Sequence, residues 1–161
     1  MSNFQEQGYN HHSSTNGSST PNGASKLPGA ADVWVIDNDI AFRFLLRCEL
    51  EDSPIRGRIR MFDDGDLALL KLITICSLNK ALLPKAIFTN IDSNRVGGWE
   101  LVRTLNEFEL DVDVVLFSAD PTNLDYEKML DKPQVKDVII KQHDPANIVE
   151  KIKQFTSAHQ T

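Results

Sequence analysis

Short apolar runs alternate with amphipathic stretches along the chain from residue 33 onward. Val33-Trp34-Val35-Ile36 has the length of a buried strand, and residues 39–51 carry apolar side chains at helical spacing. The same alternation predicts further strands at 58–62, 85–89, 112–117 and 136–140, and further helices at 67–78, 98–107, 124–130 and from Asp144-Pro145 onward. The pattern therefore predicts five strands that alternate with five helices.

The strand and helix patterns also predict which side chains are buried. Strands separated by helices run parallel with right-handed crossovers, so helices cover both faces of the sheet and the class is doubly wound α/β. The strand at 58–62 alternates polar and apolar residues, as an edge strand does. In the first helix the predicted buried stripe consists of Ile40, Phe44, Leu45 and Cys48. The apolar helix at 67–78 is expected to be buried.

The first 32 residues differ in composition from the rest of the chain. Eighteen of them are Gly, Pro, Ser, Thr or Asn, and only Glu6, Lys26 and Asp32 are charged. Such a segment buries too little apolar surface to offset the entropy cost of ordering it. We expect a disordered polar tail at 1–32, one domain at 33–156 and a short C-terminal tail at 157–161.

Composition and charge narrow the function. The net charge of −6 argues against a nucleic-acid surface. No apolar run has the length of a membrane helix, and no signal peptide is evident. Cys48 and Cys76 both fall in helical patterns, where buried thiols suit a reducing compartment. We therefore expect a cytoplasmic protein with no nucleic-acid or membrane partner.

Polar residues stand directly after four of the five predicted strands. They are Asp37-Asn38-Asp39 after the first strand, Asn90 and Asp92 after the third, Ser118 after the fourth and Lys141 after the fifth. In doubly wound sheets, ligands and chemistry collect at the carboxyl ends of the strands. These residues are therefore the candidate site.

Residues 33–156 resemble the receiver domain of response regulators, the phosphoacceptor module of two-component signalling. Four segments carry the resemblance in order and spacing: Val35-Ile36-Asp37-Asn38-Asp39, Asn90 through Glu100, Phe117-Ser118-Ala119 and Ile139-Ile140-Lys141. The resemblance implies a flavodoxin-like (βα)5 fold with strand order 2-1-3-4-5. In that family two acids after the first strand and an aspartate after the third hold Mg²⁺, and the aspartate accepts the phosphoryl group.

The resemblance places Asn90 at the phosphoacceptor position, because the family's glycine eight residues later aligns with Gly98. An amide is neutral and cannot form an acyl phosphate. Asn38 stands at the second acidic position, so two of the three anionic donors are missing. No metal or other cofactor is expected; the weak candidates for Mg²⁺ ligands are Asp37 and Asp92, and Asp39 could partly replace the missing acids.

The resemblance also assigns the rest of the receiver pocket. Ser118 and Lys141 match the hydroxyl and lysine that bind the phosphoryl group, and Lys141 is expected to bond the side chain of Asn90 instead. Val138 stands where the family has an aromatic switch residue, and it is too small and stiff for that role. Asp39 is expected to point away from the pocket, and an alternative role for Asp37 and Asp39 is to cap the first helix.

These departures favour a receiver-like interaction module that works without phosphorylation and is not an enzyme, a pseudo-receiver. Its expected partner is a histidine kinase, a phosphotransfer protein or another regulator, bound through the fourth helix, fifth strand and fifth helix. One alternative is a conventional Mg²⁺-dependent phosphoacceptor that uses Asp92. A remote alternative is a flavodoxin-like cofactor carrier, although no phosphate-binding loop follows the first strand.

Overall fold

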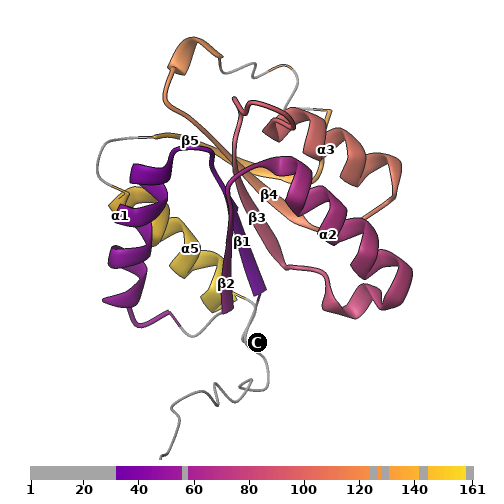
Figure 1. The fold of residues 1–161 in the computed structure, drawn as a ribbon, viewed down its shortest axis with the longest axis horizontal. Coiled ribbons are helices and arrows are strands. Elements are labelled where there is room, and N and C mark those ends of the chain that lie inside the picture. Colours follow the sequence, from indigo (N-terminus) through magenta and orange to yellow (C-terminus); the bar gives the residue numbers. More distant parts are fainter. Residues whose placement is uncertain (1–31, 56–57, 124–126, 128–130, 142–144, 159–161) are drawn as a thin grey trace, which may run out of the picture.

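The computed structural model describes residues 32–55, 58–123, 127, 131–141 and 145–158. Within them, five parallel strands form one sheet in the order β2-β1-β3-β4-β5 (Figure 1). The strands are β1 (Asp32–Ile36), β2 (Arg58–Phe62), β3 (Ala86–Asn90), β4 (Asp113–Ser118) and β5 (Val135–Ile140). This sheet confirms the predicted flavodoxin-like α/β fold, its strand order and the position of β2 at an edge.

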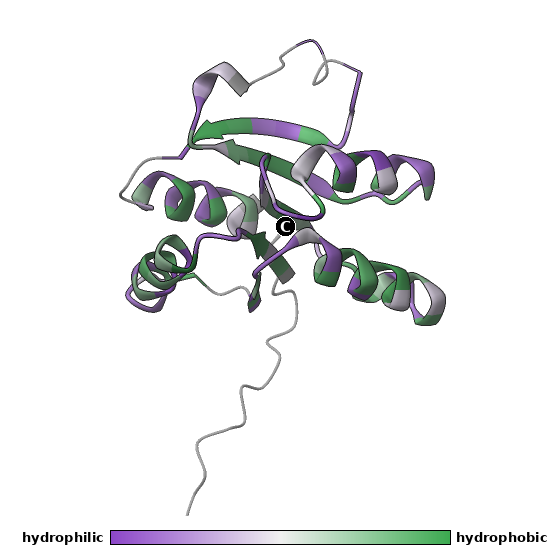
Figure 2. Ribbon diagram, turned by 45° about the horizontal axis from the view of Figure 1, so that its top comes forward, coloured by the Kyte–Doolittle hydropathy of each residue, from purple (hydrophilic) through white to green (hydrophobic). Residues whose placement is uncertain are grey.

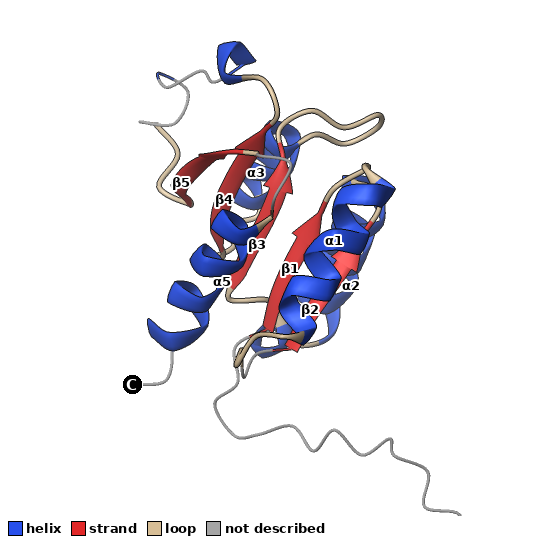
Figure 3. Ribbon diagram, turned by 90° about the vertical axis from the view of Figure 1, so that its left-hand side faces the viewer, coloured by secondary structure: helices blue, strands red, loops and turns tan. Residues whose placement is uncertain are grey.

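Helices cover both faces of the sheet (Figure 3). The α-helices that the structure describes are α1 (Ile40–Glu51), α2 (Gly65–Leu78), α3 (Gly98–Glu107) and α5 (Ala146–Ala158). Two short 3₁₀ helices, η1 (Lys80–Leu82) and η2 (Pro121–Asn123), follow α2 and β4. The helix predicted at 124–130 and the tail predicted before β1 lie almost wholly outside the described residues. The last helix runs to Ala158, two residues beyond the predicted end of the domain.

The sheet separates two apolar clusters because successive residues of a strand point to opposite faces. In β1, Val33 and Val35 join the cluster beneath α1 and α5, whereas Trp34 and Ile36 join the cluster beneath α2 and α3. All four side chains are buried. The strands are therefore continuous apolar runs because both of their faces are covered.

The structure corrects the predicted buried stripe of α1. Phe42 and Leu46 face the core, whereas the predicted stripe is exposed at Ile40, Phe44, Leu45 and Cys48. Both sets recur at helical spacing, so periodicity could not separate them. Phe42 is selected because its ring packs against Phe117 of β4, with the ring centroids 6.1 Å apart.

The prediction that α2 is a buried helix is also wrong for its outward face. Leu72 and Ile75 are buried, but Leu67, Leu70 and Leu78 are exposed. Figure 2 shows apolar residues along most of this helix. With 14 residues, α2 is too short to span a membrane. The same holds throughout the described part of the chain, where no helix is long and apolar enough to do so.

Candidate functional site

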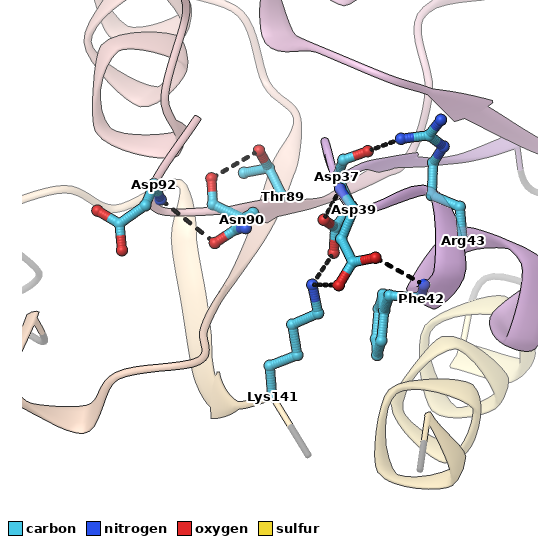
Figure 4. Close-up of polar contacts among 8 residues, drawn as sticks. All are labelled: Asp37, Asp39, Phe42, Arg43, Thr89, Asn90, Asp92 and Lys141. Carbon is cyan, nitrogen blue, oxygen red and sulfur yellow. Dashed lines mark hydrogen bonds and ion pairs between the residues drawn. The ribbon is translucent and has the colours of Figure 1, made fainter. Parts of the chain in front are cut away.

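The polar residues that follow the strands gather at one edge of the sheet (Figure 4). Asp37 comes directly after β1, Asn90 ends β3, Ser118 ends β4 and Lys141 follows β5. The strands are parallel, with one register shift between β4 and β5 at Val114–Val115, and their carboxyl ends meet at this edge. The fold therefore brings the sequence-predicted site residues into one region.

A buried ion pair between Lys141 and Asp37 occupies the centre of the site. Lys141 Nζ lies 2.7 Å from Asp37 Oδ2, and the side chains are 8% and 0% exposed. The ammonium also lies 4.0 Å from the centre of the Phe42 ring, in cation–π geometry. The Lys141 backbone is held by β4, because its N–H donates to the Ser118 carbonyl oxygen at 2.7 Å. The pair and the groups that hold it thus come from four separate elements, β1, β5, α1 and β4.

Asp39 supplies a second carboxylate to Lys141. Its Oδ2 lies 3.7 Å from Lys141 Nζ, and its Oδ1 accepts the Phe42 amide at 3.0 Å as the N-cap of α1. The expectation that Asp39 points away from the pocket is therefore wrong, while the alternative that it caps the helix is confirmed. The bond from the Phe42 amide is the main reason that the pKa of Asp39 lies below its usual range.

Burial dominates the electrostatics of Asp37. Loss of water raises the pKa of its carboxyl above the usual range, against the opposing effects of the Lys141 ammonium and of the Asp39 amide. That amide donates to Asp37 Oδ1 at 2.9 Å, and Arg43 donates to the Asp37 backbone carbonyl. Because its Oδ2 faces Lys141, the carboxylate is neutralised within the chain.

Asn90 does not bond Lys141 as predicted. Its Oδ1 accepts the backbone N–H of Asp92 at 3.2 Å, and Thr89 Oγ1 donates to its carbonyl oxygen at 3.3 Å. Lys141 instead turns to Asp37, because a carboxylate attracts an ammonium more strongly than a neutral amide does. The side chain of Asn90 therefore stabilises the turn after β3.

The remaining predicted pocket residues are engaged in their own elements. Ser118 Oγ donates to the Asp120 carbonyl at 2.9 Å and accepts the Asp120 amide at 3.1 Å, which closes a tight turn. Val138 packs against the apolar cluster beneath α2 and α3. Asn38, which lies between Asp37 and Asp39 in the sequence, is half-buried, and Asp92 is exposed. In Figure 4 the Asp92 carboxylate points away from Lys141.

These side chains make a poor Mg²⁺ site. Mg²⁺ needs several oxygen donors in octahedral geometry. Asp37 and Asp39 provide two carboxylates, and the Lys141 ammonium already lies 2.7 Å from the first and 3.7 Å from the second. The described residues contain no group of three or more His, Cys, Asp or Glu side chains arranged to hold a metal ion. Lys141 therefore competes with any metal ion for the carboxylates of Asp37 and Asp39.

Sequence reasoning missed a contact that fixes the loop after β3. Asp64 is buried, and its Oδ1 accepts the Val96 amide at 3.2 Å. Arg95 lies 3.7 Å from Asp64 Oδ2 and 2.9 Å from Asp66 Oδ2. The run Asp63-Asp64-Gly65-Asp66 predicts a helix cap, but no sequence signal links it to a loop thirty residues later.

Electrostatics and close packing support this loop contact. Burial of Asp64 opposes its ionisation, but the bonds from the Val96 and Asp66 amides and the nearby charge of Arg95 help to lower the pKa of Asp64. A Cβ at Gly65 would lie 2.3 Å from the Val96 carbonyl oxygen, so only glycine lets α2 begin against this loop. The loop that carries the residues after Asn90 is thus anchored to α2.

Comparison with solved structures identifies the class of fold. The structure superposes on the signal receiver domain of a LuxO repressor protein from Vibrio parahaemolyticus with a TM-score of 0.63 and 13% identity, covering 81% of this chain and 93% of that one. A CheY-like receiver domain from Methanospirillum hungatei gives 0.62 and 21%, covering 80% and 96%. TrrA from Thermotoga maritima, solved with Mg²⁺ and BeF, gives 0.59 and 19%, covering 78% and 98%.

The similarity to these solved structures is a similarity of fold. No protein-family model matches the sequence, and comparison with curated proteins gives no match. At these identities, the shared architecture shows that the chain has the fold of response-regulator receiver domains. The role of its site rests on its own residues.

Proposed function

We propose that this protein is a receiver-like interaction module of two-component or phosphorelay signalling that works without phosphorylation. The observation that carries the proposal is the side chain at the end of β3. Receivers accept a phosphoryl group on an aspartate there, and this chain has Asn90, whose amide oxygen bonds the Asp92 backbone. A neutral amide cannot act as the nucleophile.

The ion pair supports the same proposal. In receiver chemistry the lysine binds the incoming phosphoryl group, and the acids after β1 hold Mg²⁺. Here Lys141 and Asp37 lie 2.7 Å apart and neutralise each other's charge. Any anion or metal entering the pocket must first break a buried, charge-assisted contact. We infer that the pocket is held in one state and that Mg²⁺ is not required.

The proposed activity is contact with another protein of the same signalling pathway in the cytoplasm. A histidine kinase, a phosphotransfer protein or another response regulator is the expected class of partner. Binding to such a partner should be unaffected by phosphoryl donors. A change in affinity after treatment with acetyl phosphate would contradict this expectation.

Intact-mass spectrometry after incubation with acetyl phosphate or phosphoramidate and Mg²⁺ tests the proposal. We expect no phosphoryl adduct on the unmodified protein, whereas a receiver domain with an acceptor aspartate, treated in parallel, should gain one. An adduct that disappears in Asp92→Asn would instead establish the Asp92 phosphoacceptor. A stable adduct at any other carboxylate would also overturn the proposal.

A double variant separates the missing acids from the rest of the pocket. Asn90→Asp with Asn38→Asp restores the two carboxylates and adds negative charge beside Lys141. We expect this variant to gain Mg²⁺ affinity, measured by calorimetry, and slow phosphorylation. The single variant Asn38→Asp is the matched control, because it adds one acid without a nucleophile on β3.

A further inference from the structure

The outward side of α2 carries an apolar surface that nothing in the described part of the chain covers. Six large apolar residues on α2, η1 and the end of α3 are between 44% and 79% exposed. They are Leu67, Leu70, Ile73, Leu78, Leu82 and Phe108. We call them the α2 surface. Leu67, Leu70 and Leu78 follow one side of α2 at helical spacing and form a stripe, and Leu82 of η1 lies beyond its C-terminal end.

The apolar area of the α2 surface lies in the upper part of the range found for monomeric proteins. If a fully exposed large apolar side chain presents about 150 Å², these six present roughly 500 Å². The largest apolar patch of a monomeric protein is about 300–600 Å², and such patches are often functional. Lys71, Thr74 and Ser77 flank the stripe and are exposed. With them, the area approaches the roughly 800 Å² that one partner buries in a standard interface.

An apolar groove opens beside the stripe, between α2 and α3. Its volume is about 200 Å³, and Ile73, Cys76, Leu105 and Phe108 are among its lining residues. Pockets for small ligands usually measure about 300–1,000 Å³, so this groove is small for one. It suits a single apolar side chain of a protein partner, as buried anchors at interfaces do.

We propose that the α2 surface binds a second copy of this chain through a two-fold, antiparallel contact between the two α2 helices. A two-fold axis near Leu70 and Thr74 places Leu67 beside Leu78 of the second copy. It also places the acidic start of α2, where Asp63 is exposed and Asp66 is paired with Arg95, near Lys80 of the second copy, just beyond the helix end. Antiparallel helix dipoles and these opposite charges favour this arrangement.

The charge pattern argues for a second copy over an oppositely charged partner. Within α2 the only charged residues are Asp66 and Lys71, so the surface is nearly neutral. Its acidic end and its basic end are complementary to each other only when one helix is reversed. A strongly charged partner would find no matching field on this surface, whereas an inverted copy matches it at both ends.

Sedimentation velocity of the full chain, from low to high micromolar concentration, tests the proposal. We expect a monomer–dimer equilibrium. Leu70→Lys or Leu78→Lys should raise the dimer Kd tenfold or more, because each substitution places two charges in the contact. Phe44→Lys, at an exposed position on α1, is the matched control and should leave the Kd unchanged. A protein that stays monomeric at all concentrations would overturn the proposal, as would a dimer that survives both α2 substitutions.

Cross-linking tests the two-fold geometry without charging the surface. With Cys48→Ser and Cys76→Ser in the background, Thr74→Cys lies near the proposed axis and should form a disulfide between two copies. Leu78→Cys in the same background lies one turn away and should cross-link far less. Equal cross-linking at both positions, or none at Thr74→Cys, would contradict the antiparallel contact. A different protein that competes with the dimer for this surface would also argue against a second copy as its main occupant.

Discussion

Replacing Lys141 with methionine tests whether this lysine is the internal counter-ion of the site. Methionine keeps most of the apolar stem and removes the ammonium. The variant loses the 2.7 Å contact with Asp37 Oδ2 and the cation–π contact with Phe42. Asp37 is then left fully buried without an opposite charge. The structure therefore predicts a large loss of stability from one substitution outside the apolar core.

The expected loss follows from the burial of both partners. Removing one member of a buried ion pair costs about 3–5 kcal/mol, whereas an exposed pair is worth about 0–1 kcal/mol. The Asp39 amide still donates to Asp37 Oδ1 at 2.9 Å in the variant, so we expect the lower end, about 3 kcal/mol. This is a large share of the roughly 5–15 kcal/mol that stabilises a typical domain.

Urea unfolding at neutral pH, followed by circular dichroism and by the fluorescence of buried Trp34, measures this loss. The double variant Asp37→Asn with Lys141→Met should recover much of it, because both charges are then absent. The penalty in Lys141→Met should also shrink as the pH falls through the raised pKa of Asp37, because protonation removes the uncompensated charge. A loss below about 1 kcal/mol, independent of pH, would refute the buried pair.

Three further substitutions test other parts of the site. Because the pKa of Asp64 is lowered in the folded protein, its ionised form stabilises the fold above the ordinary pKa of about 3.9. This contribution is lost as the pH falls through the folded-state pKa. Asp64→Asn should therefore flatten the loss of stability in acid, measured as melting temperature against pH. Gly65→Ala should destabilise the protein by about 2 kcal/mol or more in urea unfolding, because its Cβ would collide with the Val96 carbonyl. Ser118→Ala should cost about 1–2 kcal/mol by the same assay, since the Asp120 turn loses both hydroxyl bonds; no change would mean that water replaces the hydroxyl.

Much of the candidate site was predictable because parallel strands impose a simple geometry. Asp37, Asn90, Ser118 and Lys141 each follow an apolar run, and such runs end at the same edge of a doubly wound sheet. The sequence alone was thus enough to place them together. It was not enough to pair them. The predicted site offered Lys141 several oxygen-bearing partners, and its close contact with Asp37 depends on burial and distance, which periodicity does not encode.

The helices show the same limit. Alternating apolar runs determined the order and type of the elements, because burial on both faces of a sheet leaves a strong pattern in the chain. In α1, however, two apolar stripes share the same period, and only contact with Phe117 selects Phe42 and Leu46 for the core. In α2, apolar residues lie on most sides, and packing on the sheet buries one side and leaves Leu67, Leu70 and Leu78 exposed.

The sequence by itself determined the receiver-like α/β architecture and the amide at the end of β3. The architecture follows from the local pattern of apolar residues, and the amide follows from the identity of residue 90. Only the tertiary structure decided that Lys141 neutralises Asp37, that Asp64 anchors the loop after β3, and that the described residues leave one face of α2 uncovered. These depend on distances between segments far apart in the chain, which are set by how the packed elements meet.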